Sequence, residues 1–396
     1  MKRSVFTSLI LVFLLITFSN CRRASDNPLT EDVFKKTVEK NFKLAKSRVD
    51  GIDVAKLFEP PLDPSPILFP QSEPGNAAQA YWEVLKDKID PRAESRQQFL
   101  DQTAPVVQVF DFAIRERLAL SPSTIDAVKA EAEKVAKLSD LAKLEEGAKR
   151  KEFNLIGEMV PIPDNILNIQ AVPLSVLKSY TACLIVKGLL SEAEGDKAKA
   201  ESSMQTAIAL GTHFTKDSIY AHYSAGLVVM EFGAIALRDF YKRNNDEPKA
   251  KAVDSFINEL GEHLGRLGTL AIRDDNGQAI NSLKTVGYLD EGVDTLAKIA
   301  SDGKVPRAMR AGAVENMMLG YVFRYMMVEK SGRSLESSDY APPSDLRIKA
   351  LEQVAATQDK SISEMAKKAA QVLVKMKAMS SPERAKYWRD LNTAQQ

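Results

Sequence analysis

Apolar residues recur every three or four positions along most of this chain, which is the spacing of helices that bury one face. The first stripe predicts a helix from near Thr30 to Gly51 and consists of Phe34, Val38, Phe42 and Ala45. Asn76 stands where an N-cap belongs, ahead of a second helical run. No window alternates convincingly between apolar and polar residues as a half-buried strand does, so the chain is predicted to be all-α.

Two further helices are predicted before residue 150. One opens at Thr103 and Pro105. The other is long, charged and capped by Ser123, and its narrow apolar stripe is Ile125, Val128, Ala132, Val135, Leu138, Leu141 and Leu144. A narrow stripe among many Lys and Glu residues indicates one buried seam and a wide solvated face.

Residues 59–75 carry six prolines and cannot form a continuous helix. We interpret this segment as a stiff connector that lies on the helical body with Ile67, Leu68 and Phe69 tucked in. The alternative is an exposed polyproline II ligand for a recognition domain. Three adjacent apolar residues favour the connector.

The N-terminus has a different pattern. Met1-Lys2-Arg3 is positively charged, and an apolar run from Val5 to Phe18 follows it. This run is shorter than the ~20 residues that cross a membrane. A basic start, a short apolar core and small polar residues before a cut point are typical of a secretory signal.

The signal ends in Phe18-Ser19-Asn20-Cys21, which resembles the lipobox of bacterial lipoproteins in its relaxed, spirochaete-type form. The resemblance implies that cleavage precedes Cys21, that the Cys21 thiol is acylated, and that this residue becomes the mature N-terminus. The common lipobox has Leu three residues before the cysteine and Gly or Ala immediately before it, and Phe18 and Asn20 depart from these. The alternative is an ordinary cleaved signal followed by an incidental cysteine. Two or more acyl chains anchor a protein stably, whereas one holds it marginally.

Residues 181–211 resemble a tetratricopeptide repeat. Two helices are expected to meet at Gly195-Asp196, with small residues at their crossing: Gly188 on the first helix, Ala200 and Ala207 on the second. Lys187, Ser191 and Thr212 depart from the repeat pattern. The next helix pair, from about residue 224 to 260, lacks the repeat's spacing, so the region is expected to be a divergent repeat neighbourhood.

Residues 293–319 can be laid over residues 349–374, with one residue inserted between the helices. Two helices, a short linker and an alanine-rich second helix look like HEAT or armadillo units, although generic helical hairpins share this spacing. The polar stretch at 331–345 is expected to be a mobile loop. The stripe Met317, Met318, Tyr321, Tyr325 and Met326 fits core packing better than an adaptable binding face.

Charge excludes some classes of partner. Cleavage before Cys21 leaves 376 residues with 52 Lys and Arg against 53 Asp and Glu, a formal charge of −1. Nucleic-acid-binding proteins and polybasic membrane-binding surfaces show a strong basic excess. This chain lacks such an excess, which argues against both classes. Cys21 and Cys183 are the only cysteines, so lipidation of the first leaves no internal disulfide.

No motif predicts a reaction, a cofactor or a metal. His213, His222 and His263 lack ligand spacing. Ser175 and Lys178 match S-x-x-K without the accompanying K-T-G, which indicates coincidence. Residues 273–277 fail the spacing of an EF-hand loop. Cys183, among apolar neighbours, is interpreted as a buried small hydrophobe.

The predicted architecture is a right-handed helical-repeat superhelix, tetratricopeptide- or HEAT-like, behind a cleaved signal peptide. The predicted segments are the signal peptide 1–20, a lipidated tether 21–29, an N-terminal helical region 30–155, a tetratricopeptide-like region 156–270 and a HEAT-like region 271–396. We expect a scaffold, lipid-anchored in the bacterial cell envelope, that binds a protein or peptide partner and not nucleic acid. The outer membrane, on its periplasmic or surface face, is the expected location. The alternative is an envelope enzyme, for example glycan-active, whose catalytic carboxylates are not in recognisable motifs.

Overall fold

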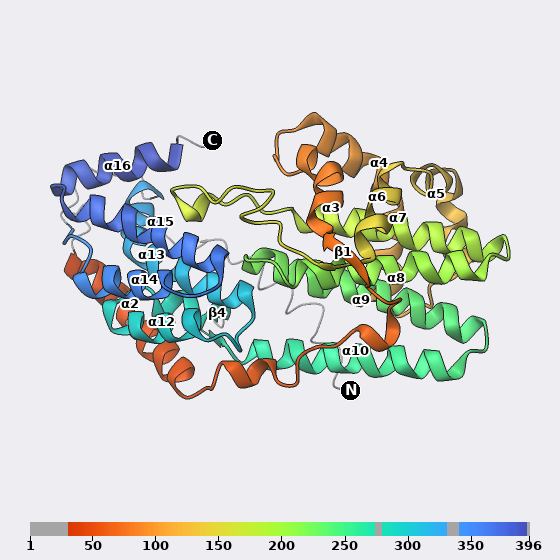
Figure 1. The fold of residues 1–396 in the computed structure, drawn as a ribbon, viewed down its shortest axis with the longest axis horizontal. Helices are drawn as coiled ribbons and strands as arrows, with labels where there is room; N and C mark the ends of the chain where they lie inside the picture. The colour runs from red at the N-terminus through yellow and green to blue at the C-terminus, as the bar shows by residue number, and fades with distance from the viewer. Residues whose placement is uncertain (1–30, 274–278, 331–339, 394–396) are drawn as a thin grey trace. The chain divides into compact units, whose positions relative to one another are not determined.

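The computed structural model describes residues 31–273, 279–330 and 340–393. This part of the chain is mostly helical, which confirms the prediction of an all-α protein (Figure 1). Short strands were not predicted, and two small sheets are present. Strand β1 (Glu73–Asn76) pairs in parallel with β2 (Arg150–Glu152), and β3 (Ala271–Arg273) pairs antiparallel with β4 (Ala279–Asn281). Strands of three or four residues are too short to show an alternating pattern of their own.

The chain forms two compact units, and both are discontinuous in sequence. Unit 1 comprises Met1–Pro60, Pro161–Ile169 and Gly265–Gln396, and unit 2 comprises Pro61–Val160 and Gln170–Leu264. The helical regions predicted from the sequence, 30–155, 156–270 and 271–396, are consecutive. A split of this kind depends on packing between distant segments, which periodicity along the chain does not report.

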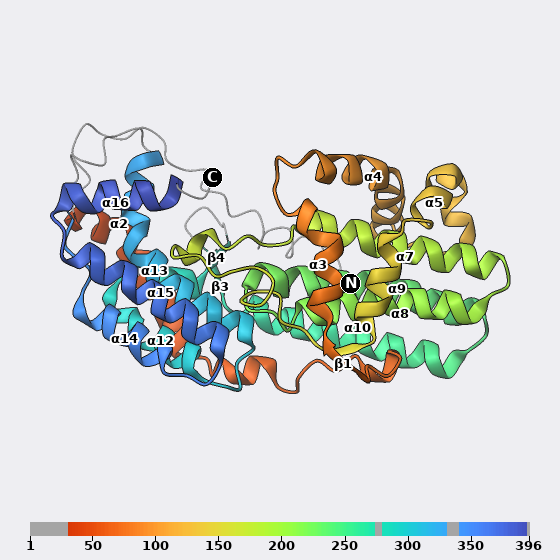
Figure 2. The same cartoon turned by 45° about the horizontal axis from the view of Figure 1, so that its top comes forward.

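Unit 2 is built on three long helices that pack side by side: α7 (Leu174–Ala193), α8 (Lys197–Phe214) and α9 (Tyr220–Arg243). Helices α4 and α5 pack on α7, and α6 packs on α8 (Figure 2). The remaining elements before α7 are η2 (Ser65–Ile67), α3 (Ala77–Leu85), η3 (Lys86–Lys88), α4 (Glu94–Arg115), η4 (Pro122–Val128), α5 (Lys129–Val135) and α6 (Asp140–Ala148). Helix α10 (Glu247–Gly268) follows α9.

Among the described residues, only α7 is long and apolar enough to cross a membrane by length and composition. Its most apolar window is 72% buried in the protein. Because the helix is surrounded by α4, α5, α8 and α9, its apolar residues form the centre of unit 2.

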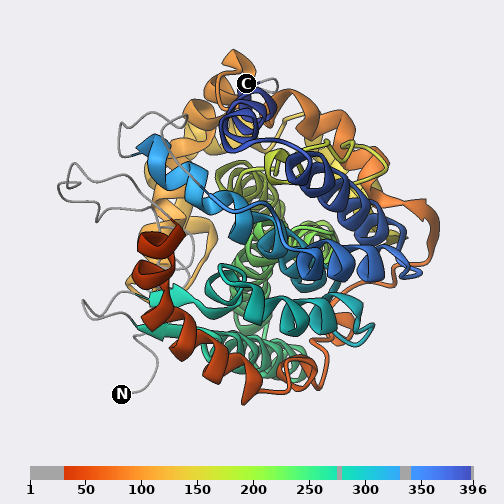
Figure 3. The same ribbon diagram turned by 90° about the vertical axis from the view of Figure 1, so that its left-hand side faces the viewer.

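Unit 1 contains two stacked helical hairpins. The first joins α12 (Val293–Ser301) to α13 (Arg307–Lys330), and the second joins α14 (Asp345–Ala355) to α15 (Lys360–Lys377). Helix α12 packs on α14 and α13 packs on α15, an arrangement visible in the teal and blue ribbons of Figure 3. The other elements are α2 (Glu31–Asp50), η1 (Ala55–Phe58), η5 (Ile166–Asn168), α11 (Ser282–Val286), η6 (Asp290–Gly292) and α16 (Ser381–Thr393).

Several local predictions are confirmed. Helix α2 ends one residue before Gly51, and its predicted stripe is buried. The Asn76 side chain accepts a hydrogen bond from the Ala78 amide at 2.9 Å and caps α3. In the proline-rich connector Ile67 is buried, whereas Leu68 and Phe69 are only half-buried. The Ile67 carbonyl accepts a hydrogen bond from Gln205 on α8. The connector therefore lies on unit 2 from Pro61 onward, as expected of a packed segment.

Two helix boundaries were predicted wrongly. Helix α4 begins at Glu94 and passes through Pro105. The Thr103 hydroxyl is buried and donates to the Phe99 carbonyl. The long charged helix is in fact three pieces, η4, α5 and α6, and its N-cap is Ser121, not Ser123. The amide of Ser121 donates to the Thr124 hydroxyl in a capping box.

Both long hairpins of unit 2 close with the same turn. Gly195 (φ +86°) ends α7 and Asn245 (φ +57°) ends α9, each in the left-handed conformation of a Schellman motif. The side chain of the next residue then accepts a hydrogen bond from a backbone amide and caps the following helix. Asp196 accepts from the Lys199 amide on α8, and Asp246 accepts from the Lys249 amide on α10. The second hairpin therefore repeats the turn chemistry of the first, although its apolar spacing differs.

Glycines set the distances between the helices of unit 2. A Cβ atom added at Gly188 would lie 3.1 Å from the Ala200 carbonyl oxygen, so α7 and α8 approach closely where the sequence predicted a crossing. A tighter crossing joins α8 to α9. There, a Cβ at Gly211 would lie 2.6 Å from the Gly226 carbonyl oxygen. A Cβ at Gly226 would likewise lie 2.6 Å from the Gly211 carbonyl oxygen.

Candidate functional site

Cys21, the predicted lipidation residue, lies outside the described residues, as do residues 274–277 of the rejected calcium loop and residues 331–339 of the polar loop. The remaining candidates are placed. Among the described residues no group of three or more His, Cys, Asp or Glu side chains is arranged to hold a metal ion.

His213 is fully buried in unit 2 and has a structural environment. Its Nδ1 lies 2.9 Å from the Tyr81 hydroxyl, and its Nε2 lies 2.8 Å from the Arg150 carbonyl oxygen. A carbonyl can only accept, so Nε2 carries the proton and Nδ1 accepts from Tyr81. Burial lowers the pKa of His213 to about 3, and the Lys216 charge acts in the same direction. The imidazole is therefore neutral and joins α8 to α3 and to strand β2.

His222 and Asp217 form a buried pair, with Nδ1 of the histidine 2.5 Å from the carboxylate. The pair has the geometry of a catalytic dyad, but both outer positions are occupied. The Val172 amide donates to His222 Nε2 at 2.7 Å, and the Ile156 amide donates to Asp217 Oδ1 at 3.2 Å. With no proton-transfer position open, the pair fixes the backbone at Ile156 and Val172 against α9 and the turn that precedes it.

The other candidates also have structural roles. His263 Nε2 lies 2.5 Å from the Tyr223 hydroxyl. Lys178 of the S-x-x-K match pairs with Asp111 at 2.5 Å, so its charge is directed to α4 and not to Ser175. Cys183 is fully buried, as predicted, and burial raises the pKa of its thiol. In the Met and Tyr stripe of α13 all members except Met326 are buried, which confirms core packing.

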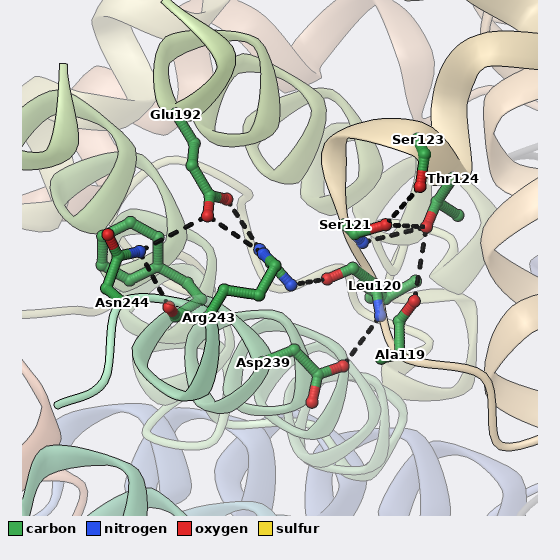
Figure 4. Close-up of polar contacts among 10 residues, drawn as sticks. Ala119, Leu120, Ser121, Ser123, Thr124, Glu192, Asp239, Arg243 and Asn244 are labelled. Atoms are coloured by element: carbon green, nitrogen blue, oxygen red, sulfur yellow. Dashed lines mark hydrogen bonds and ion pairs between the residues drawn. The ribbon is translucent and has the colours of Figure 1, made fainter. Parts of the chain in front are cut away.

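A polar clamp surrounds the backbone of Leu120 in the connection between α4 and η4 (Figure 4). The Leu120 amide donates to Asp239 Oδ2 at 2.8 Å, and its carbonyl accepts from Arg243. Arg243 also donates both Nε and Nη2 to Glu192, at 3.0 and 2.6 Å. The sequence signal for this clamp is weak, because only the spacing of four between Asp239 and Arg243 places two of its members on one helix face.

These side chains bind a backbone segment as a peptide-binding groove would, but the segment belongs to the same chain. The Leu120 side chain is fully buried, and Asp239 is only 4% exposed. Because helix α4, which precedes this segment, packs along α7, displacement of Leu120 would open the core of unit 2. The clamp is therefore a structural element that joins α4 to α7 and α9.

An open groove lies between α14 and α15 in unit 1. It has a volume of about 590 Å³. Its lining residues are Glu352, Ala355, Lys367, Ala370, Gln371, Val374 and Lys375. Val374, an apolar member of this lining, is 48% exposed. We call this the α14/α15 groove.

A second cleft, of about 600 Å³, lies between the end of α2 and α12. Its walls carry Asp50, Asp53, Glu291, Asp294 and Asp302 together with Lys46 and Lys298. Lys46 donates to Asp50 at 2.5 Å and lowers the pKa of that carboxyl, and Thr295 donates to the same side chain. This cleft is polar and its central carboxylate is already paired.

No protein-family model, characterised protein or solved structure matches this chain.

Proposed function

We propose that this chain is a bacterial lipoprotein, anchored in the cell envelope through Cys21, whose helical body binds a protein partner. The N-terminal pattern supports the anchor: a basic start, a short apolar run and a cysteine at the end of a relaxed lipobox. Acyl chains on Cys21 would hold the mature chain at a membrane, the outer membrane being the expected one.

The observation that carries the binding role is the α14/α15 groove. Small and apolar side chains line it together with Gln371 and three charged side chains, and Val374 is half exposed within it. Stacked helical hairpins commonly present such surfaces to protein and peptide ligands. The Leu120 clamp does not compete as a site because its own chain fills it.

The enzyme alternative requires a cleft in which two acids converge and at least one has a raised pKa. Burial raises the pKa of Glu231 on α9 and raises that of Glu315 on α13 to about 8. They belong to different units, and neither lines the two clefts described above. In the α2/α12 cleft the pKa of the shifted carboxyl, Asp50, moves in the opposite direction. Partner binding is therefore the function that we propose.

The test has two parts. Wild-type protein should enter the detergent phase on Triton X-114 partitioning, and Cys21→Ala should not. Unchanged partitioning of the variant would reject the anchor.

For binding, the intact anchored protein is cross-linked in its own envelope, and captured proteins are compared among wild type, Val374→Arg and Phe112→Arg. Both substitutions place arginine at an exposed apolar position, but Phe112, 52% exposed, lies on α4 of unit 2. A partner retained by wild type and Phe112→Arg and lost by Val374→Arg is the expected result. The same set of captured proteins in all three would contradict a role for the groove.

A further inference from the structure

The charges on the walls of the α14/α15 groove define the chemistry of its partner, an inference that rests on the binding function proposed above. Helix α15 carries five lysines, and two of them have internal partners. Lys368 donates to the Ile162 carbonyl at 2.5 Å, and Lys377 pairs with Asp345. Within the described residues, Lys367 and Lys375 pair with no carboxylate, and both line the groove.

These two lysines share one face of α15. They are eight residues apart, so they stand about 12 Å from each other along the helix, or roughly two turns. Val374 and Ala370 lie between them in sequence and also line the groove. Gln371, which is exposed, lies between the lysines as well, so the α15 wall is a mixed strip of small, polar and apolar side chains with a positive charge near each end. On the α14 wall the single charge is Glu352, which leaves the groove with a net positive charge.

The floor fits a helix better than a flat surface. Ala355 and Ala370 are the smallest side chains that can stand at these positions without loss of helix propensity, and they let a partner backbone approach closely. With a volume of about 590 Å³, the groove receives one face of a helix about 10 Å across and not the whole rod. A planar bilayer cannot enter it.

We propose that the α14/α15 groove binds an amphipathic helix of a partner protein, whose apolar stripe contacts Val374 and whose carboxylates, about two turns apart, pair with Lys367 and Lys375. Such a contact is smaller than a standard protein interface, so the complex is expected to be transient, with a Kd roughly in the micromolar range. Because exposed ion pairs contribute to it, affinity should fall as salt concentration rises.

Binding is tested with three synthetic 18-residue peptides, measured against residues 21–396 by fluorescence anisotropy. The first has a Leu stripe flanked by Glu, the second has the same stripe flanked by Lys, and the third keeps Glu but replaces the stripe with Gln. The first peptide should bind at least tenfold more tightly than either of the others. Equal binding of the acidic and basic peptides, or of the acidic peptides with and without the stripe, would overturn the proposal.

Charge variants locate the site. Lys367→Glu combined with Lys375→Glu should weaken the acidic peptide at least tenfold and remove its salt dependence, whereas Glu352→Gln should strengthen binding two- to threefold. Lys134→Glu, an exposed control on α5 of unit 2, should leave affinity unchanged. Circular dichroism spectra that match wild type establish that each variant is folded. Unaltered affinity in the double variant would refute the assignment.

The two levels of inference fail separately. If no peptide binds but Val374→Arg loses a partner in the envelope experiment, the partner is not an acidic helix and the binding function stands. If the acidic peptide binds through the lysines but Val374→Arg retains every envelope partner, the groove chemistry is correct and the proposed function is wrong.

Discussion

The crossing of α8 and α9 allows a substitution as small as one methyl group to be evaluated. Gly211→Ala would place Cβ 2.6 Å from the Gly226 carbonyl oxygen and 2.7 Å from the backbone nitrogen of Met230. Unstrained contacts between such atoms lie near 3.5 Å, so the two helices must separate by roughly 1 Å. The obstructing atoms are backbone, and a change of side-chain rotamer therefore cannot relieve the contact.

The expected cost follows from two opposed terms. Overpacking at a rigid contact costs about 3 kcal/mol, the upper end of the usual range. Alanine recovers about 1 kcal/mol relative to glycine within a helix. The net loss is about 2 kcal/mol. Gly261, in α10, provides the matched control because a Cβ there meets nothing within 4 Å. Gly261→Ala should stabilise by up to about 1 kcal/mol through helix propensity alone.

The chain contains two tryptophans, Trp82 in unit 2 and Trp388 in unit 1. In a Trp388→Phe background, urea unfolding followed by tryptophan fluorescence reports unit 2 alone. Gly211→Ala should lower the unfolding midpoint and Gly261→Ala should raise it, without a change in the slope of either transition. If Gly211→Ala is neutral or stabilising, as at Gly261, the two helices do not cross at this distance and our account of unit 2 packing is refuted.

Three other perturbations have defined outcomes in urea unfolding. Ala200→Leu should destabilise by ~1–3 kcal/mol, because a Cβ added at Gly188 would lie only 3.1 Å from the Ala200 carbonyl oxygen and the two helices leave little room for a larger side chain. Ala198→Leu, at an exposed position, should be nearly neutral, and equal tolerance would contradict the crossing of α7 and α8. Arg117→Gly should stabilise the protein by roughly 1 kcal/mol, because Arg117 adopts φ +57° at the end of α4, a conformation that glycine adopts without strain. A loss of stability would show that the Arg117 side chain contributes more than its backbone strain costs. The pKa of His213 is about 3 in the folded chain, against 6.5 for an ordinary histidine in the unfolded chain. Because the unfolded chain binds the proton first, the stability that neutral His213 contributes is fully present above pH 6.5. It is lost as pH falls from 6.5 toward 3, by about 1.4 kcal/mol per pH unit. His213→Gln should flatten the decline in stability between pH 6.5 and about 4.5, and an unchanged pH profile would refute that assignment.

Local pattern was sufficient wherever one segment determines its own structure. The stripe of α2, the Asn76 cap and the turn at Gly195-Asp196 depend on residues within a few positions of each other, and all three were predicted. Gly188 and Ala200 were also predicted to meet, because a short hairpin brings positions at similar distances from its turn together.

Prediction failed where tertiary packing overrides a local signal. Pro105 removes one hydrogen bond from α4 and was taken as a helix start, yet the helix continues through it. On the N-terminal side of Pro105, Phe99 is buried, and the centroid of its ring lies 4.4 Å from that of Tyr180 on α7. Contacts of this kind with α7 offset the cost of the proline, and nothing near residue 105 in the sequence reports them.

The candidate site was unpredictable for a related reason. The sequence shows α15 as an alanine-rich helix with scattered lysines, and a helical pattern alone cannot separate lysines that pair internally from those that line a groove. Lys368 and Lys367 are adjacent in sequence, but Lys368 turns toward the Ile162 carbonyl and Lys367 toward the groove, because successive residues on a helix point about 100° apart. The partner of Lys368 is more than 200 residues away, so its pairing depends on the discontinuous assembly of unit 1. Lys367 and Lys375 lie beside Val374 with no carboxylate partner among the described residues. The groove that they line belongs to the continuous α14–α15 hairpin, and it is the surface on which the proposed recognition depends.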